Sequence, residues 1–170
     1  MIIYLDEIYS SLEWWRVENR IKTKNEINSY LINVMQEFGK ISQALRGLEF
    51  ENTRKAAEHE IIEALCNISF LTINAGADIP ARKKQTEIDT SGIRHNLFNV
   101  SALIIDCGNY DRSRCTNRLY FNYILKDCTN LCKQFGYSFE LAMLEKIRAI
   151  SSGSGAYNEK ADYEKARIEK

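Results

Sequence analysis

Apolar residues recur along this chain at alternating steps of three and four, the spacing that places side chains on one face of an α-helix. Residues 52–75 differ, because apolar side chains lie on nearly every side, as is typical of a helix buried in a core. Weaker periodic patterns predict helices over about 6–21, 96–106, 117–135 and 138–150. The clearest stripe lies in residues 25–45 and consists of Ile27, Leu31, Val34, Phe38, Ile41 and Leu45. We therefore expect an all-α helical bundle of about six helices.

Residues that favour turns and helix ends divide these segments. Gly47 is expected to stop the helix over 25–45, and Asn52 or Thr53 to cap the next one. Gly76 and Pro80 should end that helix, and the polar stretch 82–92 is predicted to be an exposed loop. The Ser/Gly-rich residues 151–155 precede a charged end that is either a short helix or frayed. We predict one domain over 1–150, with additional helices over about 96–150, and a flexible charged tail over 151–170.

Composition narrows the class of protein. Of 170 residues, 45% are hydrophobic and one is proline, which favours a folded helical domain over a disordered or all-β chain. Lys and Arg number 23, as do Asp and Glu, so no net charge attracts a nucleic-acid polymer or an anionic membrane. The longest apolar stretch, 61–77, carries Glu63, Asn67 and Asn74, and the N-terminus lacks the pattern of a signal peptide. We expect a cytoplasmic protein that does not enter membranes.

Five cysteines are present, and an odd number in a cytoplasmic chain indicates free thiols. We interpret them as buried structural residues, which behave as small hydrophobic side chains. A zinc site is the alternative, but the chain has no Cys-x-x-Cys pair, and neither His59 nor His95 is placed to complete one.

A polar stripe interrupts the apolar surface of two helices. Glu60, Glu63, Asn67 and Asn74 share an arc of about 60° on the helix over 52–75. Glu37 lies beside the core stripe of the preceding helix. Carboxylates on such a helix are expected to face an interior cleft, and an oxygen-rich site of this kind suits Mg²⁺ or Mn²⁺. The alternative is that they are ordinary surface acids paired with lysines and arginines.

The order of these motifs resembles the MazG-like all-α NTP pyrophosphohydrolases of phages and bacteria. The resemblance rests on Gln36-Glu37-Phe38-Gly39-Lys40 and Glu60-Ile61-Ile62-Glu63, with Glu13-Trp14-Trp15 before them. Residues 142–147 and 151–160 are similar to the tail of the family. The family's bundle usually assembles as a homodimer or homotetramer. It hydrolyses a nucleoside triphosphate to a monophosphate and pyrophosphate with Mg²⁺ or Mn²⁺.

The resemblance also implies roles for individual residues. Glu37, Glu60 and Glu63 would be catalytic and, with Asn67, would hold the metal. The nucleotide would be contacted by Trp14, Trp15, Lys40, Asn67, Asn74, Arg148 and Lys160.

The metal motif departs from the family's pattern, because Lys40 stands at a position of a glutamate ligand and Gln36 replaces the first acid. If the Lys40 ammonium turns toward the carboxylates, it replaces a cation; if it turns outward, one metal can still bind. Three hypotheses follow: a pyrophosphohydrolase, a catalytically inactive protein that sequesters a nucleotide or nucleotide signal, and an unrelated helical interaction protein.

Overall fold

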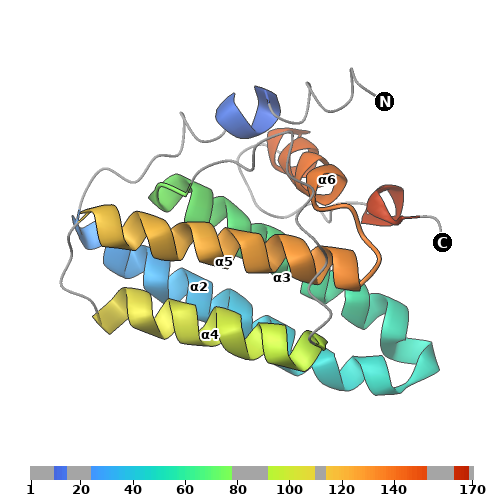
Figure 1. Cartoon of the computed structure of the whole chain (residues 1–170). Helices are drawn as coiled ribbons and strands as arrows, with labels where there is room; N and C mark the ends of the chain where they lie inside the picture. The colour runs from blue at the N-terminus through green and yellow to red at the C-terminus, as the bar shows by residue number, and fades with distance from the viewer. Residues whose placement is uncertain (1–9, 15–23, 78–91, 110–113, 153–162, 169–170) are drawn as a thin grey trace.

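The protein is all-α, as the sequence predicts, and a computed structural model describes residues 10–14, 24–77, 92–109, 114–152 and 163–168. Residues 10–14 are helical, and no strand occurs in these ranges. The remaining elements are the helices α2 (Lys24–Ala44), α3 (Glu51–Ala75), α4 (Ile93–Asn109), α5 (Arg114–Gln134) and α6 (Phe139–Ser152), and the 3₁₀ turns η1 (Leu45–Glu49) and η2 (Tyr163–Ala166) (Figure 1).

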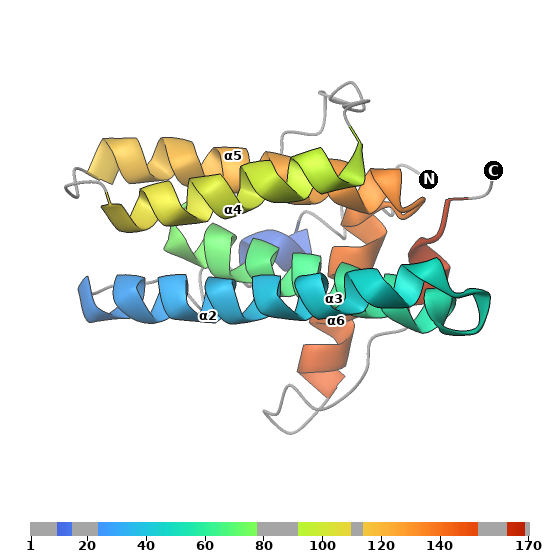
Figure 2. The ribbon, with the colours of Figure 1, turned by 90° about the horizontal axis from the view of Figure 1, so that it is seen from below.

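Helices α2, α3, α5 and α4 form a ring of four, because each of them contacts the next and α4 contacts α2 again. In Figure 2, α3 lies between α2 and α5, and α6 runs across the bundle. Two hydrogen bonds fix α2 and α3 as antiparallel: Tyr30 with Thr72 (3.2 Å) and Asn67 with Glu37 (3.0 Å). The later residue of α2 thus faces the earlier residue of α3. None of the helices in the described ranges combines the length and apolarity needed to cross a membrane.

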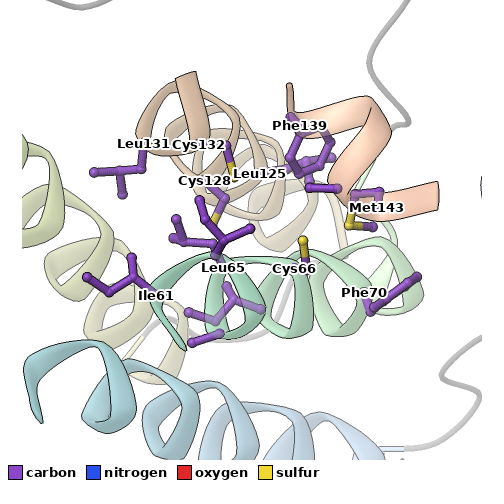
Figure 3. Close-up of a cluster of buried hydrophobic side chains, with 14 of the residues drawn as sticks. Ile61, Leu65, Cys66, Phe70, Leu125, Cys128, Leu131, Cys132, Phe139 and Met143 are labelled. Atoms are coloured by element: carbon purple, nitrogen blue, oxygen red, sulfur yellow. The ribbon is translucent and has the colours of Figure 1, made fainter. Parts of the chain in front are cut away.

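The centre of the core is α3, as its all-round apolar pattern predicts. Eleven of its residues are buried, and they face both the bundle and α6. Figure 3 shows the part of this core where three helices meet. Its labelled side chains are Ile61, Leu65, Cys66 and Phe70 of α3, Leu125, Cys128, Leu131 and Cys132 of α5, and Phe139 and Met143 of α6.

The predicted stripe of α2 faces this core. Val34 and Ile41 are fully buried, whereas Leu31, Phe38 and Leu45 are partly buried and pack against the core from its edge. Tyr30 and Ala44 are also buried, although the stripe does not include them. The orientation of α2 was therefore correctly predicted, but its buried face is wider than one row of residues.

The predicted helix ends hold in part. Gly76 ends α3 as expected: it has φ 116°, and the amides of Gly76 and Ala77 bond back to the last turn. The predicted cap of α3 at Asn52 or Thr53 is wrong, because α3 begins at Glu51 after the extended Phe50. The Thr53 hydroxyl instead donates to the carbonyl oxygen of Gly47, at 2.8 Å. This bond ties η1 to the first turn of α3.

The other helices are longer than expected. Helix α4 extends the predicted range 96–106 at both ends, and α5 and α6 each differ from prediction by one to three residues at their ends. Most of the helix expected over 6–21 and most of the loop expected over 82–92 lie outside the described residues.

Residues 163–168 pack against the bundle. Tyr163 and Ala166 are buried, and Tyr137 and Arg167 form an antiparallel bridge. The bridge is flanked by bonds from Ser138 N to Ala166 O and from Ile168 N to Gly136 O, each 2.7 Å. For residues 163–168 the structure differs from the predicted flexible tail, because the buried side chains of Tyr163 and Ala166 anchor this charged segment to the bundle.

Candidate functional site

Glu37 is the best-connected carboxylate of the predicted site. Its Oε1 accepts a hydrogen bond from Lys40 Nζ, at 2.7 Å, and its Oε2 accepts one from Asn67 Nδ2, at 3.0 Å. The Glu37 side chain is 14% exposed and that of Lys40 is 59% exposed. Lys40 therefore lies at the edge of the α2–α3 interface, with its ammonium turned back onto the carboxylate one helical turn before it. Both oxygens of Glu37 are engaged by groups of the protein.

Glu63 has a different partner, which the sequence did not point to. Lys146 of α6 donates a hydrogen bond to Glu63 Oε1 at 3.0 Å. The Lys146 side chain is 2% exposed and that of Glu63 is 35% exposed. A buried ammonium is unfavourable unless a carboxylate compensates it, so this ion pair links α3 to α6. We call Glu37, Lys40, Glu63, Asn67 and Lys146 the carboxylate seam.

The third predicted ligand, Glu60, is exposed and makes no ion pair with another described residue. The structure thus brings Glu37 and Asn67 together, pairs Glu63 with a lysine of another helix, and leaves Glu60 in solvent. Burial raises the pKa of the neighbouring Cys66 thiol to about 12, so this thiol is protonated at neutral pH and is not a nucleophile.

Of the residues expected to contact a nucleotide, Lys40 and Asn67 belong to the seam. Trp14 is 55% exposed, and Arg148 donates to Glu145 Oε1 at 3.1 Å. The buried amide oxygen of Asn74 accepts no hydrogen bond from a described residue. Trp15 and Lys160 lie outside the described residues.

The seam does not fit a divalent metal as it stands. Mg²⁺ and Mn²⁺ bind through free lone pairs of carboxylate oxygens, preferably from several carboxylates. Here two ammonium groups and an amide N–H already occupy three of the four oxygens of Glu37 and Glu63. Within the described ranges, no group of three or more His, Cys, Asp or Glu side chains is arranged to hold an ion. A cation at Glu37 would lie beside the Lys40 ammonium, which would repel it.

A cavity of about 380 Å³ lies elsewhere, between α2, η1 and α4, and it contains none of the predicted site residues. Its lining combines apolar side chains, of which Ile41 and Leu97 are buried, with two guanidinium groups, one carboxylate and two phenyl rings. Neither Arg46 nor Arg94 forms an ion pair with any residue that the structure describes. The lining residues are Phe38, Ile41, Ser42, Leu45, Arg46 and Glu49 from α2 and η1, and Arg94, Leu97, Phe98 and Ser101 from α4.

This cavity was not predicted from the sequence, because the fourth helix was expected to begin at Asn96, which left Arg94 outside any predicted helix. Once α4 begins at Ile93, Arg94 and Phe98 are four residues apart and share a face. Phe38 and Ser42 have the same spacing on α2. A periodicity search for cationic and aromatic residues together would have found the row on α4.

Comparisons with family models, with curated proteins and with solved structures find no significant match to this chain.

Proposed function

We propose that this chain is a metal-independent nucleotide-binding protein, a catalytically inactive relative of the MazG-like pyrophosphohydrolases. One observation carries the proposal: both oxygens of Glu37, the residue at the heart of the resemblance, are engaged by Lys40 and Asn67. The lysine stands where the resembled family has a glutamate. An ammonium in that place supplies the positive charge that the cluster would otherwise take from a metal.

Electrostatics favours this arrangement over a metal site. Lys40 and Lys146 each neutralise one carboxylate, so the seam holds no excess negative charge to attract a divalent ion. Metal-assisted hydrolysis needs a bound cation that lowers the pKa of an attacking water. With the lysines in place no such water is activated, and we expect a bound triphosphate to remain intact.

Nucleotide binding is supported by the resemblance and by the cationic, aromatic character of the α2–α4 cavity. Guanidinium groups bind phosphate oxygens, and phenyl rings stack on bases. The free thiols of Cys66, Cys128 and Cys132 favour a reducing compartment, as expected of a cytoplasmic protein. Assembly as a homodimer or homotetramer is supported by exposed apolar side chains on α4 and α5, namely Ile105, Leu119 and Tyr123.

The test measures binding and turnover separately. ATP, GTP, CTP, UTP and their deoxy forms are titrated calorimetrically into the protein in EDTA, then in Mg²⁺ and in Mn²⁺. Each nucleotide is afterwards recovered and assayed for monophosphate and pyrophosphate. We expect at least one nucleotide to bind equally well in EDTA and in Mg²⁺ and to be recovered unchanged.

Two outcomes contradict the proposal. Pyrophosphate release that depends on Mg²⁺ or Mn²⁺ would establish the hydrolase instead. If none of the eight nucleotides binds, and circular dichroism shows that the protein is folded, the better hypothesis is a helical interaction protein. Lys126→Glu, an equal change of charge at an exposed position of α5, is the control for variants of Lys40.

A further inference from the structure

We infer that the cavity between α2 and α4 is where the nucleotide binds, with its phosphates on Arg46 and Arg94 and its base against Phe98. The inference rests on the proposed function for the class of ligand. The location itself follows from the arrangement of charge, aromatic rings and volume in the described residues.

The antiparallel course of α2 and α4 sorts the lining residues by type. In both ribbon views the start of α4 lies toward the η1 end of α2 (Figures 1 and 2), and the two helices contact each other. Arg46 in η1 and Arg94 in the first turn of α4 therefore share one end of the cavity. Phe38 in α2 precedes Arg46 and Phe98 follows Arg94 in α4, so both rings lie away from this end. The cavity thus has a cationic end and an aromatic end, which is the polarity of a nucleotide.

The cationic end is suited to an anion. The lining residues include two guanidinium groups and one carboxylate, that of Glu49, which leaves a net positive charge among them. Because neither arginine is engaged in an ion pair with a described residue, both can form bidentate hydrogen bonds to phosphate oxygens. The amino end of α4 adds the positive end of its helix dipole.

The aromatic end is suited to a flat ring. Phe98 is 74% exposed, so its ring leaves apolar surface in contact with water, which is unfavourable. A base stacked on this ring would cover it. The inner wall below is apolar, with Ile41 and Leu97 buried. The volume of about 380 Å³ lies within the range of roughly 300–1,000 Å³ that is typical of small-molecule sites.

The experiment repeats the calorimetric titration in EDTA with the ribonucleotide that binds most tightly among ATP, GTP, CTP and UTP. The variants are Arg46→Gln, Arg94→Gln and Phe98→Ala. Matched controls are Arg54→Gln, whose side chain is 65% exposed outside the cavity, and Phe50→Ala, whose ring is 62% exposed at the start of α3. Inorganic triphosphate and the corresponding nucleoside serve as partial ligands.

We expect each arginine variant to weaken nucleotide and triphosphate binding by about tenfold or more, the effect of one charge-assisted hydrogen bond. Phe98→Ala should weaken nucleotide and nucleoside binding by about fivefold or more and leave triphosphate binding unchanged. Ser42→Trp, at an exposed lining position, should fill the cavity and abolish binding. Both controls should bind as wild type. Because all the substituted side chains are exposed, melting temperatures should stay unchanged.

If the wild-type protein binds a nucleotide and all four cavity variants bind it equally well, the nucleotide does not bind in this cavity. The proposed function, nucleotide binding by the protein, would then still stand. If the wild-type protein binds no nucleotide, the proposed function fails, and this inference fails with it.

Discussion

Lys146 is almost fully buried in α6, and its only compensation within the described residues is the half-exposed Glu63 carboxylate, 3.0 Å away on α3. The two ends of this ion pair are therefore unequal. Glu63 can return to water if its partner is removed, whereas the Lys146 ammonium cannot.

This inequality predicts different costs for removing each charge. Glu63→Gln leaves a buried ammonium without a carboxylate and should lower the free energy of unfolding by about 2–3 kcal/mol. Lys146→Met keeps the volume and removes the buried charge, so it should cost less than about 1 kcal/mol. Urea unfolding of both variants and of the double variant measures this directly. Equal losses from the two single changes would show that burial does not govern the pair.

Gly47 predicts a steric effect at the η1–α3 junction. A Cβ atom there would lie 2.8 Å from Cβ of Ala57, so Gly47→Ala should destabilise the protein by about 1–3 kcal/mol. Gly39 is the matched control within α2, where an added Cβ meets no atom within 4 Å. Gly39→Ala should stabilise by about 0.5–1 kcal/mol. Thermal unfolding distinguishes the two; a stabilised Gly47→Ala would contradict the close approach.

The three cysteines of the core should be chemically inert in the folded protein. Burial raises the pKa of Cys66 to about 12 and raises the pKa values of Cys128 and Cys132 well above the ordinary value. Thiolates are the reactive form, so iodoacetamide at pH 8 should not label these residues until urea is added. Peptide mass spectrometry reads each site separately. Rapid labelling of Cys66 in the native protein would contradict its burial in the core.

Because the pKa of Glu164 is lowered in the folded protein, we expect its contribution to stability to be lost in acid. The hydrogen bond with His59, at 2.7 Å, is the main cause that lowers the pKa of Glu164 below 4.5, and Arg167 and Lys55 add to it. A carboxyl whose pKa is lower when folded stabilises the protein above its unfolded pKa, and this contribution disappears as the pH falls through the folded pKa. Glu164→Gln should therefore lower the melting temperature near neutral pH but not below the folded pKa. Glu60→Gln, at an exposed position of α3 without an ion pair to a described residue, is the control; a difference that persists in strong acid would contradict the linkage.

Local periodicity was enough to predict most of the fold. The stripe of α2 and the all-round apolar pattern of α3 identify the two helices that carry the seam, because burial of those faces drives the packing. Partners far apart in the chain could not be predicted in this way. Lys146 lies 83 residues from Glu63, and α6 must cross the bundle before the two meet. Periodicity places a residue on a face but does not say which other helix covers that face.

The candidate site was predicted less well for the same reason. Glu37 and Asn67 were expected near each other, and they are hydrogen-bonded. Glu60 shares their arc by helical spacing, yet its side chain is exposed. The Lys40 side chain could extend into solvent or turn back to the Glu37 carboxylate one helical turn away. The sequence does not distinguish these two orientations.

The central claim is that Lys40 takes the place of a metal ion at Glu37, and binding of Mn²⁺ followed by electron paramagnetic resonance tests it most directly. The wild-type protein and the Lys126→Glu control should leave Mn²⁺ free in solution. Lys40→Glu should bind it, because a second carboxylate replaces the ammonium one turn from Glu37. Stoichiometric binding of Mn²⁺ by the wild-type protein, lost on Glu37→Gln, would contradict the account.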